Sequence, residues 1–176
     1  MNDSPLVAPV CVGELKDGDL TLEFVRFAPH AIHAVPAYHF RMVHTFAHTE
    51  LGQINLRVGS SRHIEFHAGH VGYLVHPAHR GHRYAARSLR LLFGLAQAHR
   101  LNPLVITCDP DNPASQRTLD LVGASFVQVV DLPPECVIFQ SGKRKKDAVC
   151  FVPGLSGGRE RCFLIVIVDR TQKVRA

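Results

Sequence analysis

Apolar and polar residues alternate over residues 20–27, and a period of two is typical of a strand with one buried face. Residues 38–45 and 51–58 are predicted as two further strands, with a turn near residues 48–50. Residues 63–67 are interpreted as a short strand or an extended rim. The first part of the chain therefore predicts a sheet, preceded by a turn at residues 13–19.

A different pattern begins at residue 72. Residues 72–76 form an apolar run that Pro77 ends, and residues 104–108 form a second run. Between them, apolar residues recur every three or four positions from Tyr84 to Arg100, which predicts a helix lying on a sheet. A strand, a helix and a strand within this length predict a βαβ unit with parallel strands.

A second helix is predicted to start at Asn112 as N-cap, with Pro113 at its first position, and to stop at Gly123. Residues 125–130 and 162–168 read as strands. The stretch between them, residues 133–161, is long and polar in its middle, so we expect a loop or a flexible hairpin.

Length and composition favour one globular domain over residues 1–176, with residues 1–19 as an N-terminal arm. Hydrophobic residues make up 46% and charged residues 20% of the chain. The five cysteines form no Cys-x-x-Cys pair, and no signal peptide or membrane-length apolar run is present, so a reduced cytoplasmic protein without membrane contact is expected. The net charge of +5 favours anionic partners, although a modest excess is weak evidence for nucleic acid.

The residues between the strand and the first helix carry the clearest chemistry. A helix N-terminus offers unpaired N–H groups and a favourable dipole to an anion. Arg80, His82 and Arg83 add side-chain donors, and Gly81 allows close approach of the backbone. The loop therefore predicts a phosphate or pyrophosphate site, yet it fits neither a Walker loop nor the dinucleotide fingerprint.

The stretch from Val75 to Ala85 resembles the acetyl-CoA loop of the GNAT N-acetyltransferase superfamily, Val-x-Pro-x-x-Arg-Gly-x-Gly-x-Gly/Ala. It departs from that pattern at Arg83, where the family usually has glycine. A second motif, Asn112 and Ser115 followed by Gly-Ala-Ser-Phe at residues 123–126, resembles the segment that comes next in the family. The resemblance spans roughly residues 38–131.

The resemblance implies an α/β fold with a mixed central sheet flanked by helices. It also implies acetyl transfer from acetyl-CoA to an amine acceptor. The residues that the resemblance assigns to acetyl-CoA are Leu74 and Val75 through their backbone, the loop residues Arg80, Gly81, His82, Arg83, Tyr84 and Ala85, and Asn112.

One departure concerns the acceptor side. The family usually carries two helices between its first two strands, and only residues 28–37 separate them here. We therefore expect a reduced N-terminal helical region. The acceptor pocket is then either open or completed by residues 133–161 or by another subunit, as in a homodimer.

The catalytic residues are less clear. His70 and Glu65 are the first candidates for a general base, and His67 is a third; for each of them, a rim residue is the simpler interpretation. The tyrosine that often acts as general acid in the family is replaced by Leu119, which leaves water or Ser115. A non-catalytic acyl-CoA-binding or regulatory module is therefore the second hypothesis.

The chain contains twelve histidines, which raises the question of a metal site. His63, Glu65 and His67 share one face of the expected strand, and His76, His79 and His82 recur every three residues. Neither spacing matches a zinc template, so no metal is expected.

Overall fold

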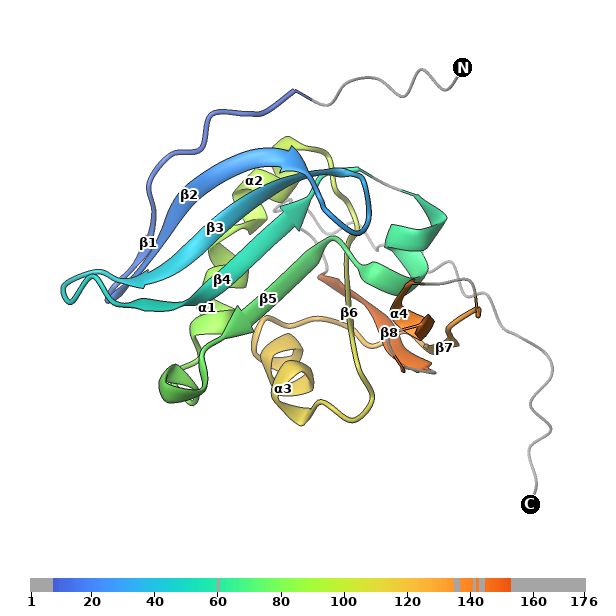
Figure 1. Cartoon of the computed structure of the whole chain (residues 1–176). Coiled ribbons are helices and arrows are strands. Elements are labelled where there is room, and N and C mark those ends of the chain that lie inside the picture. The colour runs from blue at the N-terminus through green and yellow to red at the C-terminus, as the bar shows by residue number, and fades with distance from the viewer. Residues whose placement is uncertain (1–7, 60, 135–136, 141, 143–144, 153–176) are drawn as a thin grey trace.

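The computed structural model describes residues 8–59, 61–134, 137–140, 142 and 145–152 (Figure 1). The strands are β1 (Leu15–Asp17), β2 (Leu20–Pro29), β3 (Pro36–His44), β4 (Glu50–Arg57), β5 (Val71–Val75), β6 (Leu104–Cys108), β7 (Val129–Asp131) and β8 (Lys145–Val152). The helices are α1 (Tyr84–Leu91), α2 (Phe93–Ala98), α3 (Pro113–Leu121) and α4 (Val137–Gln140), with a π-turn η1 (Ile64–Ala68) and a 3₁₀ turn η2 (Pro77–His79).

The first sheet has the order β1-β2-β3-β4-β5, and each neighbouring pair is antiparallel. Its alternating residues face a core shared with α1 and α2. Tyr38 lies opposite Leu56 and Phe40 lies opposite Ile54, and all four are at most 1% exposed. This confirms the strands expected in the first part of the chain, and the burial of such large side chains is the main source of stability.

The helical pattern from Tyr84 to Arg100 is confirmed as helical, but it is divided at Leu92. The N–H of Leu92 is shared between the carbonyls of Ser88 and Leu89, which tightens the last turn of α1. Leu89 and Leu92 are fully buried. The apolar face of the helical segment therefore packs on the sheet on both sides of the division.

The second sheet has the order β6-β8-β7. The loop or hairpin expected at residues 133–161 is wrong in part, because residues 145–152 form β8 and pair with both neighbours. β7 is shorter than the strand expected at residues 125–130. The strand expected at residues 162–168 lies outside the described residues.

Two local predictions fail for the same reason. Residues 63–67 were interpreted as a strand or rim, but they form most of η1, and residues 13–19 contain the edge strand β1 as well as a turn. Both segments are short, and local sequence preference over so few residues is overridden by tertiary packing.

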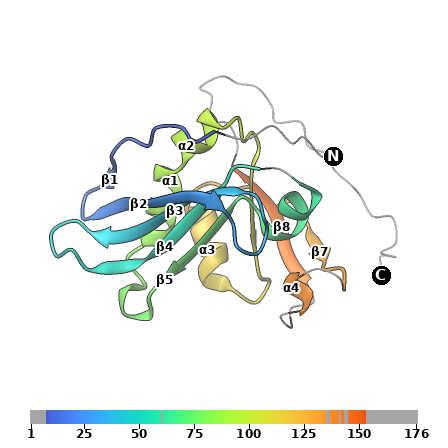
Figure 2. The same cartoon turned by 45° about the horizontal axis from the view of Figure 1, so that its top comes forward.

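β5 and β6 are the two strands of the predicted βαβ unit, but they belong to different sheets. At their start, the His70 N–H donates to the Val105 carbonyl at 2.7 Å. Beyond this point the strands diverge, as Figures 1 and 2 show. The predicted parallel pair is therefore corrected: the described strands share no parallel ladder, and a gap between their backbones opens toward the carboxyl ends of both strands.

A tight turn joins β2 to β3. The His30 N–H donates to the Val35 carbonyl and the Ala34 N–H donates to the His30 carbonyl, so the connection holds no helix. The face of the first sheet opposite α1 is uncovered by any helix of the described chain (Figure 2). This confirms the reduced N-terminal helical region.

None of the described helices is both long and apolar enough to cross a membrane.

Two glycines test the packing of the sheet. A Cβ at Gly52 would lie 2.1 Å from the Leu74 carbonyl oxygen, whereas a Cβ at Gly94 in α2 would meet no atom within 4 Å. We predict that Gly52→Ala lowers the free energy of unfolding by about 2–3 kcal/mol. The matched control Gly94→Ala should raise it by about 0.5–1 kcal/mol. Urea unfolding monitored by circular dichroism measures both, and equal effects would contradict the register of β4 and β5.

Candidate active site

The gap between β5 and β6 is closed at one end by His70. Its backbone N–H donates to the Val105 carbonyl, its Nδ1 accepts the Val105 N–H at 3.0 Å, and its carbonyl accepts the Arg57 N–H. The side chain is 2% exposed, and burial lowers its pKa to about 4. His70 therefore joins the two sheets as a neutral ring, and this geometry does not favour it as the general base.

The backbone of β5 alternates between its two edges. The His76 N–H donates to the Leu51 carbonyl and the Leu74 carbonyl points at Gly52, so the even-numbered residues of β5 pair with β4. Tyr73 and Val75 consequently direct their N–H and C=O groups into the gap. Val75 therefore fits the backbone contact to acetyl-CoA that was expected of it. Leu74 does not, because its N–H and C=O groups face β4, and Tyr73 faces the gap instead. The register of β4 with β5 shows this difference.

At the open end of the gap lies the loop predicted to bind an anion. The Arg80 Nε–H donates to the Val75 carbonyl at 3.2 Å, which ties the guanidinium to the end of β5. Gly81 has φ +89°, and a Cβ there would meet no atom within 4 Å. Arg83 is the N-cap residue of α1 and has φ 60°, a left-handed conformation. That conformation is costly for a residue other than glycine, which gives a physical reason for the glycine that the family pattern has there.

The N-terminus of α1 opens toward the same place. Its first N–H groups have no intrahelical acceptor, and no side chain of Arg83 caps them. Tyr84 is 6% exposed and its hydroxyl donates to Asp19 at 3.0 Å, so its side chain anchors the helix to the first sheet. Tyr84 and the small buried Ala85 can therefore offer backbone groups to a ligand, while Arg80, His82 and Arg83 can offer exposed side chains.

Helix α3 brings a third group to the gap. Asn112 is its N-cap, and the side-chain oxygen accepts the Ser115 N–H at 3.0 Å. The Tyr73 hydroxyl donates to Ser115 Oγ at 3.1 Å, which links β5 to α3 across the gap. Leu119, at the position where the family often has tyrosine, is 3% exposed and packs in the core. The contact of Tyr73 with Ser115 is visible only in the structure, because the two residues are far apart in the sequence.

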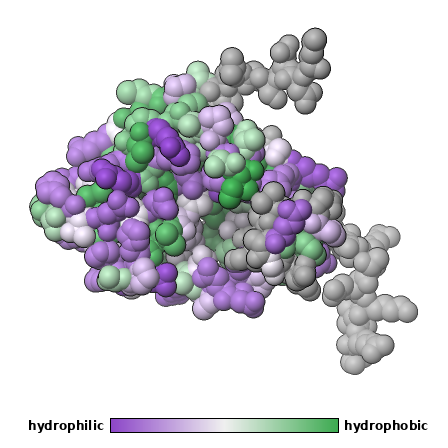
Figure 3. Space-filling model, viewed as in Figure 1, coloured by the Kyte–Doolittle hydropathy of each residue, from purple (hydrophilic) through white to green (hydrophobic). Residues whose placement is uncertain are grey.

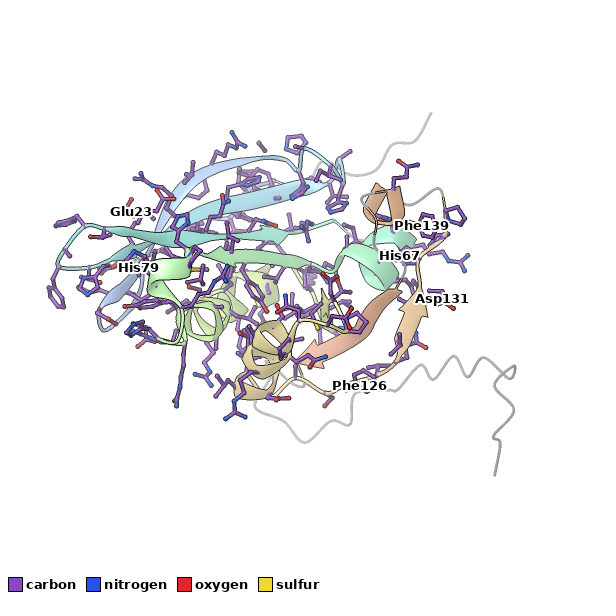
Figure 4. All side chains as sticks on the ribbon, turned by 60° about the horizontal axis from the view of Figure 1, so that its bottom comes forward. Glu23, His67, His79, Phe126, Asp131 and Phe139 are labelled. Atoms are coloured by element: carbon purple, nitrogen blue, oxygen red, sulfur yellow. The ribbon has the colours of Figure 1, made fainter. Side chains whose placement is uncertain are left out.

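The remaining base candidates lie at the closed end. Glu65 is exposed in the first turn of η1, and the His67 carbonyl accepts the Thr107 hydroxyl at 3.1 Å. Figure 4 shows His67 and the loop residue His79 at opposite ends of β5. The structure therefore brings the loop, β5 and α3 together and leaves Glu65 and His67 apart from them.

Behind the closed end lies a group of histidines around Arg57. Arg57 is 6% exposed and donates to the carbonyls of Ala68 and Gly69, and burial lowers its pKa to about 10. The His30 ring stacks on that of His33 with 4.7 Å between centroids, and His33 contacts His63. Within the described part of the chain, no group of three or more His, Cys, Asp or Glu side chains is arranged so that it could hold a metal ion.

A family model described as Acetyltransferase (GNAT) domain matches residues 15–125, well over half of the chain. No curated protein matches.

Among solved structures, a GNAT-family acetyltransferase from Bacillus anthracis is 15% identical with a TM-score of 0.49, covering 65% of this chain and 64% of that one. A ribosomal-protein-S5-alanine acetyltransferase from Vibrio fischeri is 20% identical with a TM-score of 0.49, covering 65% and 60%. The matches thus span less than two thirds of either neighbour.

The pKa of His70 has a consequence for stability. The ring binds a proton in the unfolded chain at a pKa near the usual 6.5 but in the folded chain only near 4, so stability is complete above pH 6.5 and falls as the pH drops toward 4. The loss from this residue should reach about 3 kcal/mol. Denaturant unfolding from pH 7.5 to 4.5 should show a flatter pH dependence for His70→Gln than for the parent protein. The exposed control His82→Gln should keep the parent slope, and a parent slope in His70→Gln would refute the assignment.

Proposed function

Since the chain belongs to the GNAT acetyltransferase family, we propose that it transfers an acetyl group from acetyl-CoA to an amine. The observation that carries the proposal is the gap between β5 and β6, with the arginine-bearing loop and a helix N-terminus at its open end. A cytoplasmic location is part of the same proposal.

The loop suits the pyrophosphate of CoA. Gly81 leaves open space beside the backbone, and the first N–H groups of α1 point outward with the positive end of the helix dipole. The exposed guanidinium groups of Arg80 and Arg83 add charge-assisted donors. The pantetheine arm would then lie along the unpaired edge of β5.

The N–H groups of Tyr73 and Val75 would polarise the thioester carbonyl, because preorganised donors stabilise the charge that develops on its oxygen. The neutral amine attacks the carbonyl carbon, a C–N bond forms and the C–S bond breaks; the nitrogen loses a proton to solvent and the thiolate takes one up. The Tyr73–Ser115 pair joins β5 to α3 across the gap and would supply that proton.

The amine must first lose a proton. Of the predicted bases, Glu65 is exposed and His70 is buried; since Glu65 lies in η1, apart from the loop and α3, it would act through intervening water molecules.

The second candidate function is a non-catalytic acyl-CoA-binding module. It is favoured by Leu119, which is buried and has no acidic proton to offer. An amine-acceptor screen with acetyl-CoA that reads out free thiol separates the two functions. Tight binding of acetyl-CoA with no thiol release for any amine would establish the module.

The loop assignment is tested with Arg80→Ala. Removal of a charge-assisted contact should cost about 1.5–3 kcal/mol of binding free energy, so the Kd for acetyl-CoA should rise by about ten- to a hundredfold. Arg117, an exposed arginine on α3, provides the matched control Arg117→Ala, which should bind as the parent does. Calorimetry measures both affinities, and equal affinities for all three proteins would contradict the assignment of the loop as the binding site.

Arg83 allows a test in which stability and binding change in opposite directions. Arg83→Gly relieves the left-handed backbone, so the free energy of unfolding should rise by about 0.5–1 kcal/mol. Acetyl-CoA should nevertheless bind more weakly, because a phosphate contact is lost. Tighter binding would instead mean that the side chain crowds the loop.

The proposed acid is tested with Tyr73→Phe, which keeps the ring and removes the hydroxyl. We expect kcat to fall about a hundredfold while the KM for acetyl-CoA stays unchanged, since general acid catalysis contributes at least this much. Tyr38→Phe is the matched control, because the Tyr38 hydroxyl bonds to Val10 and His99 and β4 separates its strand from β5. An unchanged kcat in Tyr73→Phe would leave water as the proton source.

A further inference from the structure

The first turn of α1 is joined to the first sheet by polar contacts near the surface. Hydrophilic residues predominate on the visible surface over β1 and the loop (Figure 3). Four side chains make the contacts and are here called the anchor: Asp17 at the end of β1, Asp19 in the turn that follows, and Tyr84 and Arg87 on α1. The anchor therefore connects the sheet to the helix N-terminus at which an anion would bind.

The sheet side of the anchor is a tight turn. Gly18 and Asp19 connect β1 to β2, and Gly18 has φ +57°, which suits glycine at the first position of a two-residue hairpin turn. The Asp19 carbonyl accepts the Thr45 N–H at 2.7 Å, and the Gly18 carbonyl accepts the Thr45 hydroxyl at 3.3 Å. Because Thr45 directly follows β3, these bonds fix the backbone from which the Asp19 carboxylate projects.

Each oxygen of the Asp19 carboxylate has a partner on α1. Oδ2 accepts the Tyr84 hydroxyl at 3.0 Å, and Oδ1 pairs with Arg87 Nη2 at 2.7 Å. Asp17 pairs with Nε of the same arginine at 2.7 Å. The Arg87 guanidinium holds the pKa of Asp19 below its usual value, so the carboxylate is ionised near neutral pH. Burial and the hydrogen bond to Asp19 raise the pKa of Tyr84, so its hydroxyl remains a donor.

Tyr84 is the residue through which the anchor reaches the loop. The His82 ring stacks on the Tyr84 ring with 5.6 Å between their centroids, and the Arg87 guanidinium lies 5.5 Å from the centroid of the Tyr84 ring. The Tyr84 N–H is the first of α1 and has no intrahelical acceptor. The Arg87 N–H donates to the Arg83 carbonyl at 3.0 Å, which closes the first turn of the helix. Tyr84 therefore supports a side chain of the loop and presents a backbone donor to the same place.

We propose that Asp19 is a positioning residue for the pyrophosphate of acetyl-CoA: through the Tyr84 hydroxyl, it holds the first turn of α1 and His82 in the arrangement that the anion requires. The inference rests on the proposed function and adds a residue that acts through Tyr84 instead of by contact with the ligand. Donors that are already ordered lose less conformational freedom when a ligand binds. The anchor should therefore strengthen the binding of acetyl-CoA and leave the chemical step beside β5 unchanged.

The proposal is tested with Asp19→Ala and Tyr84→Phe, which remove opposite ends of one hydrogen bond. Tyr84→Phe keeps the buried ring, so it retains the packing of the helix. Calorimetry with acetyl-CoA should give a Kd about tenfold above that of the parent protein for each variant. The double variant should bind no more weakly than Asp19→Ala, because effects that pass through one contact are not additive. With an amine from the acceptor screen, the KM for acetyl-CoA should rise by the same factor while kcat stays within about twofold.

Two further variants separate positioning from charge and from general stability. Glu23→Ala is the matched control, because it removes a carboxylate that pairs with Arg41 at 2.6 Å on the same sheet, and it should bind acetyl-CoA as the parent does. Asp19→Asn keeps an oxygen that can accept the Tyr84 hydroxyl, so its Kd should lie within about threefold of the parent value. Tighter binding by Asp19→Asn would show that the carboxylate only repels phosphate and would overturn the proposal. An unchanged Kd in Tyr84→Phe, or additive losses in the double variant, would overturn it as well.

The outcomes distinguish the anchor from the enzymatic function. If acetyl-CoA binds but no amine accepts the acetyl group, the proposed function is refuted, and the affinities of the variants alone decide the role of Asp19. If the parent does not bind acetyl-CoA, amide hydrogen exchange of the ligand-free protein still tests the anchor. The Arg87 amide should then exchange faster in Asp19→Ala and Tyr84→Phe than in Glu23→Ala, because its bond closes the first turn of α1. Equal exchange in all three variants would overturn the anchor.

Discussion

The contact between His70 and Val105 is the constraint on which the rest of the structure depends. It joins the two sheets through both backbone and ring, and beyond it β5 and β6 separate. An unpaired strand edge is normally a liability, because its N–H and C=O groups invite association with other chains. Here the edge of β5 formed by Tyr73 and Val75 faces β6 and α3, so its N–H and C=O groups remain available to a ligand in the gap.

Backbone strain is concentrated at the open end of the gap, in the loop before α1. Arg83 holds a left-handed conformation that glycine adopts more easily, and strained residues tend to gather where function requires a particular backbone path. The loop keeps this path because Tyr84 is anchored to Asp19 and Arg87 forms ion pairs with Asp17 and Asp19. The short turn between β2 and β3 leaves the face of the first sheet opposite α1 uncovered by any described helix.

The sequence was informative where a pattern is local. The bounds of β6 and the Asn112 cap of α3 were predicted from apolar runs and capping residues, because both signals lie within a few positions. Leu74 could not be assigned correctly, since only strand register shows which edge of β5 its backbone faces. Tyr73 was missed for a related reason: its importance depends on Ser115, which lies on an element distant in sequence. The strand β8 carries too weak an alternation to be distinguished from a basic loop.

Amide hydrogen exchange with and without acetyl-CoA tests the central claim most directly, namely that the gap and its loop form the ligand site. The account predicts that acetyl-CoA slows exchange at Tyr73, at Val75 and in the first turn of α1, because these N–H groups gain an acceptor. The amides of Gly72 and Leu74 already pair with β4, so they should change little. Protection confined to other segments, or equal protection of both sets along β5, would contradict the account.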